Sequence, residues 1–187
     1  LHSMGGIFAL KVCVYAICKN ESQFVDRFMD SMSEADYVCV LDTGSSDDTV
    51  KKLRARGAIV GETVISPWRF DTARNESLGL IPADADICCA IDLDEQFHPG
   101  WRAALERAWQ PDATRARYRY TWSFRPDGSE GMVFWADKIH KNGCYRWASP
   151  VHETLAYTGE GAERFVDAAG VQLDHHPDET KSRGQYL

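Results

Sequence analysis

The chain has 187 residues, 44% of them hydrophobic, and a formal net charge of -7. This length can bury one sizeable core, and no linker rich in proline, glycine or serine divides it, so we expect a single domain over residues 1–187. The acidic balance, with basic residues mixed among acidic ones, argues against a nucleic-acid partner. Since no stretch approaches the roughly 20 apolar residues of a membrane-spanning helix, we expect no transmembrane segment.

Six cysteines occur, and none belongs to a Cys-x-x-Cys pair. Most of them stand in apolar runs that resemble strands. They fit neither a disulfide framework nor a zinc module. We interpret them as reduced core cysteines of a cytoplasmic protein.

Strand patterns and helix patterns alternate through the first half of the chain. We expect strands at 11–18, 37–41, 58–64 and 86–91. Helices are expected after a capping box formed by Asn20 and Gln23, around Val50 and Leu53, over 72–80, and from Trp101 to Trp109. Alternation of this kind predicts an α/β fold with a mainly parallel sheet, helices on both faces, and ligands at the carboxyl ends of the strands.

The pattern changes after Pro111. Aromatic residues alternate with arginines and hydroxyl residues over 117–124, a turn is expected at 125–130, and a further strand at 132–139. We therefore expect a mainly antiparallel C-terminal part. Residues 181–187 indicate the start of a helix, so the domain is expected to be truncated at its C-terminus.

The segment Ala90-Ile91-Asp92-Leu93-Asp94-Glu95 joins a buried strand to a pair of carboxylates. Strand alternation would place Asp92 and Asp94 on one side of the backbone, where both can face a hard cation and the diphosphate it carries. An isolated Asp-x-Asp also occurs in solvated loops, so its value depends on other segments that agree with it.

Two further segments follow strand ends. Asp42-Thr43-Gly44-Ser45 lies at a strand-to-helix junction, where a carboxylate can receive hydrogen bonds from a nucleoside; a capped turn is the alternative. Arg74 and Asn75 lie near the start of a helix after the aromatic loop 67–70. Arg74 could bind a diphosphate or pair with the neighbouring Asp71.

Four segments together resemble the signature of family 2 glycosyltransferases with the GT-A fold. They are Ile17-Cys18-Lys19-Asn20-Glu21, Asp42-Thr43-Gly44-Ser45, Ala73-Arg74-Asn75-Glu76-Ser77 and Asp92-Leu93-Asp94-Glu95. The resemblance implies a nucleotide-diphosphate sugar as donor, most simply a UDP-sugar. It also implies a divalent metal, Mn²⁺ or Mg²⁺, and inversion at the anomeric carbon.

The resemblance also assigns roles to individual residues. It implies that the donor is bound by Ile17, Lys19, Asn20, Glu21, Asp42, Thr43, Gly44, Arg74, Asn75, Asp92 and Leu93, and the metal by Asp92, Asp94 and His175. Many relatives have a second Asp where this chain has Thr43. The nucleobase that the donor site would recognise is therefore less defined. Residues 1–110 would form the nucleotide-sugar-binding half and residues 111–187 the acceptor-side half.

Pro150-Val151-His152-Glu153 resembles a segment that subgroups of this family place beside the acceptor. Glu153 is the candidate catalytic base, alongside Asp94 as the second catalytic residue; a solvent-facing strand glutamate is the alternative. His175, on the same strand face as Val171 and Leu173, is a likelier metal ligand than His176. The acceptor, whether saccharide, lipid-linked glycan or peptide, is not specified by the sequence.

Two other functions compete with transfer. A nucleotide-binding module without activity would keep Asp42 and the Asp-x-Asp but lack a working base. A nucleotidyltransferase would share the α/β core and acidic metal site, yet the segment 17–21 has no glycine of the expected phosphate-binding loop. A zinc peptidase is disfavoured because no second His follows His152 and Glu153 at the required spacing.

Overall fold

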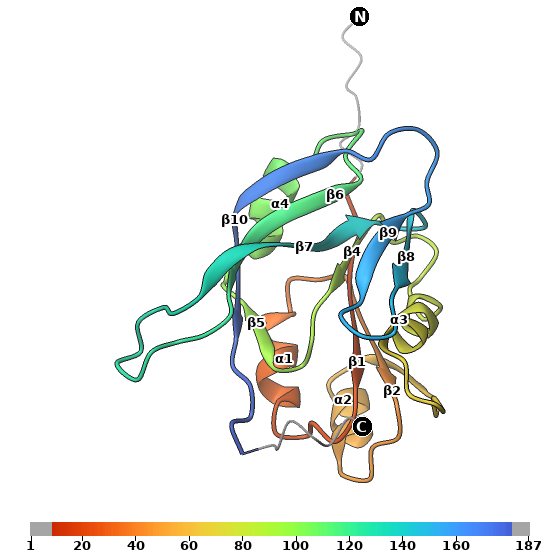
Figure 1. Cartoon of the computed structure of the whole chain (residues 1–187), viewed down its shortest axis with the longest axis vertical. Helices are drawn as coiled ribbons and strands as arrows, with labels where there is room; N and C mark the ends of the chain where they lie inside the picture. Colours follow the sequence, from red (N-terminus) through yellow and green to blue (C-terminus); the bar gives the residue numbers. More distant parts are fainter. Residues whose placement is uncertain (1–8, 181–187) are drawn as a thin grey trace, which may run out of the picture.

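The computed structural model describes residues 9–180 (Figure 1). Residues 1–8 and 181–187, which include the expected helix start, lie outside this range. The first part of the chain forms β1 (Val12–Cys18), α1 (Val25–Ser31), β2 (Tyr37–Asp42), α2 (Thr49–Ala55), β3 (Ile59–Glu62), α3 (Phe70–Leu78) and β4 (Ile87–Ala90). The second part forms β5 (Glu95–Phe97), α4 (Trp101–Ala108), β6 (Arg115–Thr121), β7 (Val133–Lys141), β8 (Tyr145–Ala148), β9 (Thr154–Tyr157) and β10 (Phe165–His175).

The parallel part of the sheet reverses its strand order at β1. Strand β1 pairs in parallel with β2 on one side and β4 on the other, and β3 extends the sheet beyond β2. The chain therefore runs outward from β1 to β3 and then returns past β1 to β4. Ligands of open α/β sheets bind outside the carboxyl ends of the strands at such a reversal. The ends of β1 and β4 thus mark the place where a ligand site is expected.

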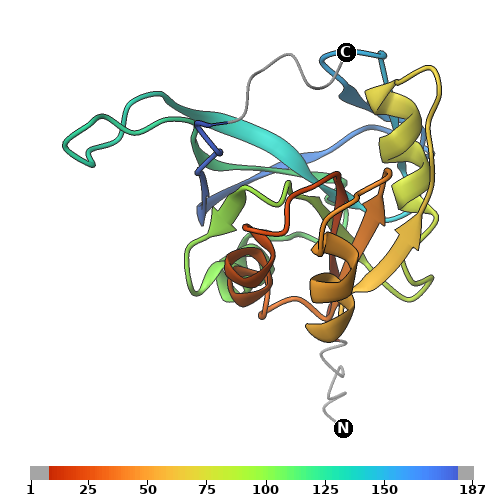
Figure 2. The same cartoon turned by 90° about the horizontal axis from the view of Figure 1, so that it is seen from below.

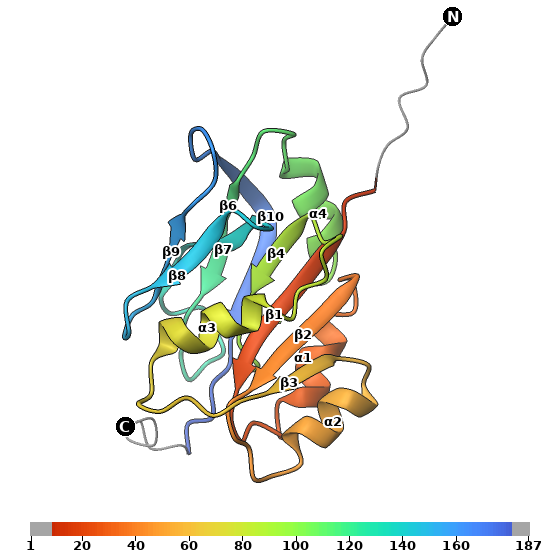
Figure 3. The same cartoon turned by 90° about the vertical axis from the view of Figure 1, so that its right-hand side faces the viewer.

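Helices cover both faces of the sheet, as the sequence predicts (Figures 2 and 3). Alternate residues of β1 point to opposite faces, so Val14 packs in one core cluster and Tyr15 in the other. The first cluster also contains side chains of α1, α2 and α4, and the second contains side chains of α3, β8 and β9. Burial from both faces explains why β1 and β4 are almost continuously apolar.

The second half is antiparallel in part. Strand β7 pairs antiparallel with both β4 and β6, and β8 with β9. Strand β10, however, runs parallel to β6 on the side away from β7. The β6–β7 hairpin projects from the body of the molecule (Figure 1).

Two local predictions are wrong. The capping box at Asn20 does not form: α1 begins at Val25 without a side-chain cap, and Asn20 takes a positive φ of 53°. Its side-chain oxygen instead accepts a hydrogen bond from the Ser46 N–H at 2.7 Å. Strand β4 ends at Ala90, so Asp92 and Asp94 follow the strand and are not related by strand alternation.

The cysteines match their sequence interpretation. All six are free, and five of them are buried while Cys144 is partly exposed. In the described range, the helices are too short or too polar for any of them to cross a membrane.

Candidate functional site

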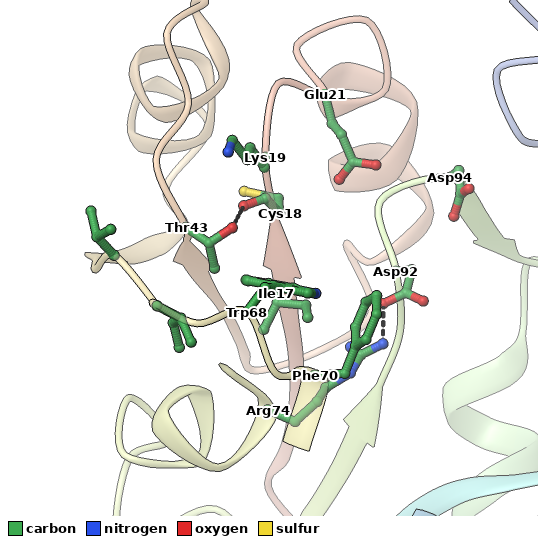
Figure 4. A pocket seen from close by; sticks show the side chains of 12 residues that line it. Ile17, Cys18, Lys19, Glu21, Thr43, Trp68, Phe70, Arg74, Asp92 and Asp94 are labelled. Atoms are coloured by element: carbon green, nitrogen blue, oxygen red, sulfur yellow. Dashed lines mark hydrogen bonds and ion pairs between the residues drawn. The ribbon is translucent and has the colours of Figure 1, made fainter. Parts of the chain in front are cut away.

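A cavity of about 400 Å³ opens at the carboxyl ends of β1 and β4 (Figure 4). Its size falls in the range of small-molecule sites. The residues that line it are Ile17, Cys18, Lys19, Glu21, Thr43, Val64, Ile65, Trp68, Phe70, Arg74, Asp92 and Asp94. They include side chains from each of the four segments that carry the family resemblance, so the fold brings these segments together.

Arg74 is the most enclosed charge in the cavity. It is 3% exposed, and its Nη2 lies 2.7 Å from Asp92 Oδ1 while its Nε lies 3.1 Å from Glu153 Oε1. The alternative pairing with Asp71 does not occur, since Asp71 pairs with Arg69 at 2.7 Å. Arg74 Nη1 is buried and has no hydrogen-bond partner among the described residues. Such a donor gains most from an acceptor atom supplied by a ligand.

A buried glutamate braces the turn that carries Asp92 and Asp94. Glu95 is 4% exposed, its Oε2 accepts the Asp92 N–H at 2.8 Å, and its Oε1 accepts the Tyr120 hydroxyl at 2.6 Å. Burial, with the charge of Asp92 as a second cause, raises the pKa of Glu95 to about 7. Burial alone would raise the pKa of Asp92. The positive charges of Arg74 and Lys138 outweigh this effect and hold that pKa below its usual range.

Asp94, in the turn before β5, lies beside His175 at the end of β10. His175 Nε2 lies 3.2 Å from Asp94 Oδ2, and the backbone N–H of His176 donates to the Asp94 carbonyl at 2.8 Å. Burial lowers the pKa of His175, but the hydrogen bond and the charge of Asp94 outweigh this effect, so the pKa lies above its ordinary value. The structure thus brings together two of the three predicted metal ligands.

Asp94 and His175 fit a divalent cation whose other ligands come from a bound substrate. No group of three or more His, Cys, Asp or Glu side chains within residues 9–180 is arranged to hold a metal by itself, and Asp92 pairs with Arg74. Mg²⁺ needs only one or two carboxylates when phosphates and water complete its shell, and adjacent ligands of such an ion lie about 3 Å apart. The spacing of Asp94 and His175 meets this requirement.

Glu153 lies next to the cavity, against Arg74. Its side chain is 13% exposed and is held by Arg74, so the alternative of a solvent-facing strand glutamate is wrong. Two non-glycine residues with positive φ, Ser149 at 77° and His152 at 56°, precede it. Backbone conformations of this kind persist where the surrounding structure enforces them, often at functional sites.

Three predicted residues at the carboxyl ends of β1 and β2 have structural partners. Asp42 is 2% exposed, and its carboxylate accepts the backbone N–H groups of Gly44 and Ser45 at 3.0 and 2.8 Å. This is the capped turn considered as the alternative. Asn20 fastens the same loop through Ser46, and Gly44 supplies a φ of 110° in it. These residues shape the loop, whereas the neighbouring Thr43 faces the cavity.

Two other predicted residues point away from the cavity. Asn75 holds the backbone of Trp147: its Nδ2 donates to the Trp147 carbonyl at 2.8 Å, and its Oδ1 accepts the Trp147 N–H at 2.9 Å. Leu93 is fully buried in the core. Asn75 therefore joins α3 to β8, and the ring of Trp147 in turn lies 5.4 Å from the Arg74 guanidinium.

The loop between β3 and α3, together with the first residue of α3, contributes residues that the sequence motifs do not identify. Val64, Ile65, Trp68 and Phe70 line one side of the cavity. Trp68 and Phe70 pack edge to face with ring centroids 5.2 Å apart, and Trp68 Nε1 has no hydrogen-bond partner in the described part of the chain. The aromatic character of the 67–70 loop is the one signal in the sequence that could have found them.

No protein-family model matches the chain. Glucosyl-3-phosphoglycerate synthase from Mycobacterium tuberculosis, in complex with Mn²⁺, UDP and glucosyl-3-phosphoglycerate, is similar at 25% identity and a TM-score of 0.48 over 60% of this chain and 44% of that chain. The same enzyme with Mn²⁺ and UDP-glucose gives 24% and 0.49 over the same shares. The chain thus spans less than half the length of these structures.

A crystal structure of a mycobacterial protein is similar over more of the chain. It matches 92% of this chain and 69% of its own length, at 16% identity and a TM-score of 0.59. The α/β fold described above is therefore shared with a solved structure over nearly the whole chain.

Proposed function

We propose that this chain is a metal-dependent, inverting glycosyltransferase of the GT-A type, which moves a sugar from a nucleotide-diphosphate donor to an acceptor hydroxyl. The observation that carries the proposal is the convergence of Arg74, Asp92, Asp94 and Glu153 at the point where the strand order reverses. A UDP-sugar is the proposed donor. Residues 1–110 are assigned to donor binding and residues 111–187 to the acceptor side.

The charges of the cavity support the proposed role of a cation. Three carboxylates line it, those of Glu21, Asp92 and Asp94, against two basic side chains, Lys19 and Arg74. A diphosphate placed among these carboxylates would be repelled unless a divalent cation lay between them. Asp94 and His175 would hold that cation, and when bound it neutralises charge on the departing diphosphate.

The remaining polar groups have roles that follow from their positions. Arg74 lines the cavity, where its guanidinium can donate a charge-assisted hydrogen bond to a phosphate oxygen. Lys19 and Thr43 lie at the ends of β1 and β2, where the nucleoside would bind, and Trp68 also lines the cavity (Figure 4). Glu153 would accept the proton of the acceptor hydroxyl as that oxygen attacks the anomeric carbon.

Hydrolysis and transfer assays with UDP-glucose and Mn²⁺ test the proposal, because water can replace an unidentified acceptor. We expect wild-type protein to release UDP, and Glu153→Gln to lower kcat by about 10²-fold or more while the Kd of UDP stays unchanged. Glu160→Gln, which changes an exposed glutamate of the same half, serves as the control. Equal rates in Glu153→Gln and wild type would remove Glu153 from the mechanism.

The competing functions give different results in the same assay. A nucleotide-binding module without activity would bind UDP with Mn²⁺ but release none from any of several UDP-sugars. A nucleotidyltransferase would form pyrophosphate from UTP and a sugar phosphate. Either result would replace the proposed function.

A further inference from the structure

Trp122 lies against the candidate metal ligand His175. It follows the last residue of β6, and since β6 and β10 run parallel with Thr121 beside Asp174, Trp122 and His175 come side by side. Their rings are stacked, with centroids 4.4 Å apart and planes inclined by 18°. The Trp122 backbone is itself fixed, because its N–H donates to the Met132 carbonyl at 2.9 Å.

The same residue makes a second contact with the imidazole. His175 Nδ1 lies 3.1 Å from the Trp122 carbonyl oxygen. A carbonyl oxygen only accepts, so Nδ1 donates to it, and Nε2, which lies 3.2 Å from Asp94, is the nitrogen that can bind a cation in place of its hydrogen bond to Asp94. A histidine that ligates a metal commonly donates its other ring N–H to such a group, which fixes both tautomer and ring orientation.

We infer that Trp122 is a positioning residue for the divalent cation: its indole and its carbonyl together hold His175 with Nε2 directed at the cation site beside Asp94. The inference rests on the proposed function. The stacked indole restricts rotation of the imidazole about its side-chain bonds. The carbonyl, which accepts a hydrogen bond from Nδ1, determines that Nε2 is the nitrogen facing the cation site. Trp122 itself does not touch the reacting atoms.

The hairpin also offers a matched control. Phe134 pairs with Tyr120 across β6 and β7 and contacts its ring, on the side of the sheet that faces His175. Trp135, the next residue, therefore points to the opposite face, beside Arg119. Trp135 is 55% exposed and Trp122 is 45% exposed, so the two tryptophans differ in face and not in exposure.

Calorimetric titration of Mn²⁺ into protein mixed with excess UDP tests the inference without any need for turnover. We expect Trp122→Ala to weaken Mn²⁺ binding by about 10-fold or more, as removal of such a supporting group usually does, while Trp122→Phe keeps the stack and restores most of the affinity. Trp135→Ala should match wild type. The thermal midpoint without ligand should be the same for the two alanine variants.

A spectroscopic measurement separates positioning from a general structural effect. Electron spin echo spectra of the bound Mn²⁺ should show coupling to an imidazole nitrogen in wild type and Trp122→Phe, and a weakened or absent coupling in Trp122→Ala. Unchanged Mn²⁺ affinity and unchanged nitrogen coupling in Trp122→Ala would overturn the inference. Failure of wild-type protein to bind Mn²⁺ with UDP would instead overturn the proposed function on which it rests.

Discussion

Arg74 Nη2 lies 2.7 Å from Asp92 Oδ1, inside the cavity and almost out of contact with solvent. The same guanidinium reaches Glu153 through Nε. One residue of α3 thus connects the Asp-x-Asp turn after β4 with the segment that carries the candidate base. Any change at Arg74 is expected to affect stability and donor binding together.

Replacement of Arg74 by Gln should destabilise the protein by about 3 kcal/mol, because it leaves a largely buried carboxylate at Glu153 and a partly exposed one at Asp92 without their partner. Urea unfolding measures this free energy. The control is Arg54→Gln, which breaks the Arg54 pair with Glu62 where both side chains are more than half exposed and should cost less than about 1 kcal/mol. Equal losses in the two variants would contradict the assigned burial of Arg74.

His140 predicts how stability depends on pH. It is 1% exposed, and burial lowers its pKa to about 4. Its Nδ1 lies 3.1 Å from the Lys141 carbonyl and its Nε2 lies 2.8 Å from the Tyr15 hydroxyl, so a neutral ring satisfies both contacts. Tyr15 receives the Trp147 indole N–H, and Arg115 adds a nearby positive charge that also disfavours protonation.

Between pH 6.5 and 4, the unfolded chain therefore binds a proton at His140 that the folded protein does not. Stability from this group falls as the pH falls through that range, by about 3 kcal/mol in total. We expect the difference in unfolding free energy between wild type and His140→Gln to be largest near pH 7 and to shrink on acidification to pH 4. A difference that stays constant with pH would show that His140 is protonated equally in both states.

Asn75 is expected to act through the fold. Asn75→Ala removes both hydrogen bonds to the Trp147 backbone and should cost about 1 to 3 kcal/mol, because a buried N–H and a buried carbonyl lose their partners. At temperatures where the variant remains folded, its Kd for UDP with Mn²⁺ should stay within about 3-fold of wild type. A large loss of UDP affinity with unchanged unfolding free energy would return Asn75 to the donor site, as the family resemblance implies.

The elements that the sequence predicts well are those whose pattern is local. Apolar runs and helical spacing located β1, β2 and β4 and the four helices to within a few residues, because both faces of this sheet are buried. Strand β5, with three residues, and the hairpin β8–β9 have no comparable pattern. The predicted capping box does not form because the Asn20 side chain accepts a hydrogen bond from Ser46, in the loop after β2. A pattern of neighbouring residues does not predict a contact between two separate segments.

The candidate site was predictable in part for the same reason. Motif residues that follow strand ends, such as Thr43 and Asp94, line one cavity because parallel strands end at one edge of the sheet. The contact of Arg74 with Glu153 joins residues 79 positions apart, and the stack of Trp122 on His175 depends on the parallel pairing of β6 and β10. Those relationships arise from tertiary packing, which the sequence pattern does not express.

The most direct test of the central claim is calorimetric titration of UDP, and then GDP, in the presence and absence of Mn²⁺, on wild type, Asp94→Ala and the control Asp84→Ala. Asp84 is exposed and pairs with Lys11, away from the cavity. We predict that UDP binds wild type and Asp84→Ala only when Mn²⁺ is present, and that Asp94→Ala abolishes this binding. Binding of UDP that needs no metal, or that survives in Asp94→Ala, would contradict the account.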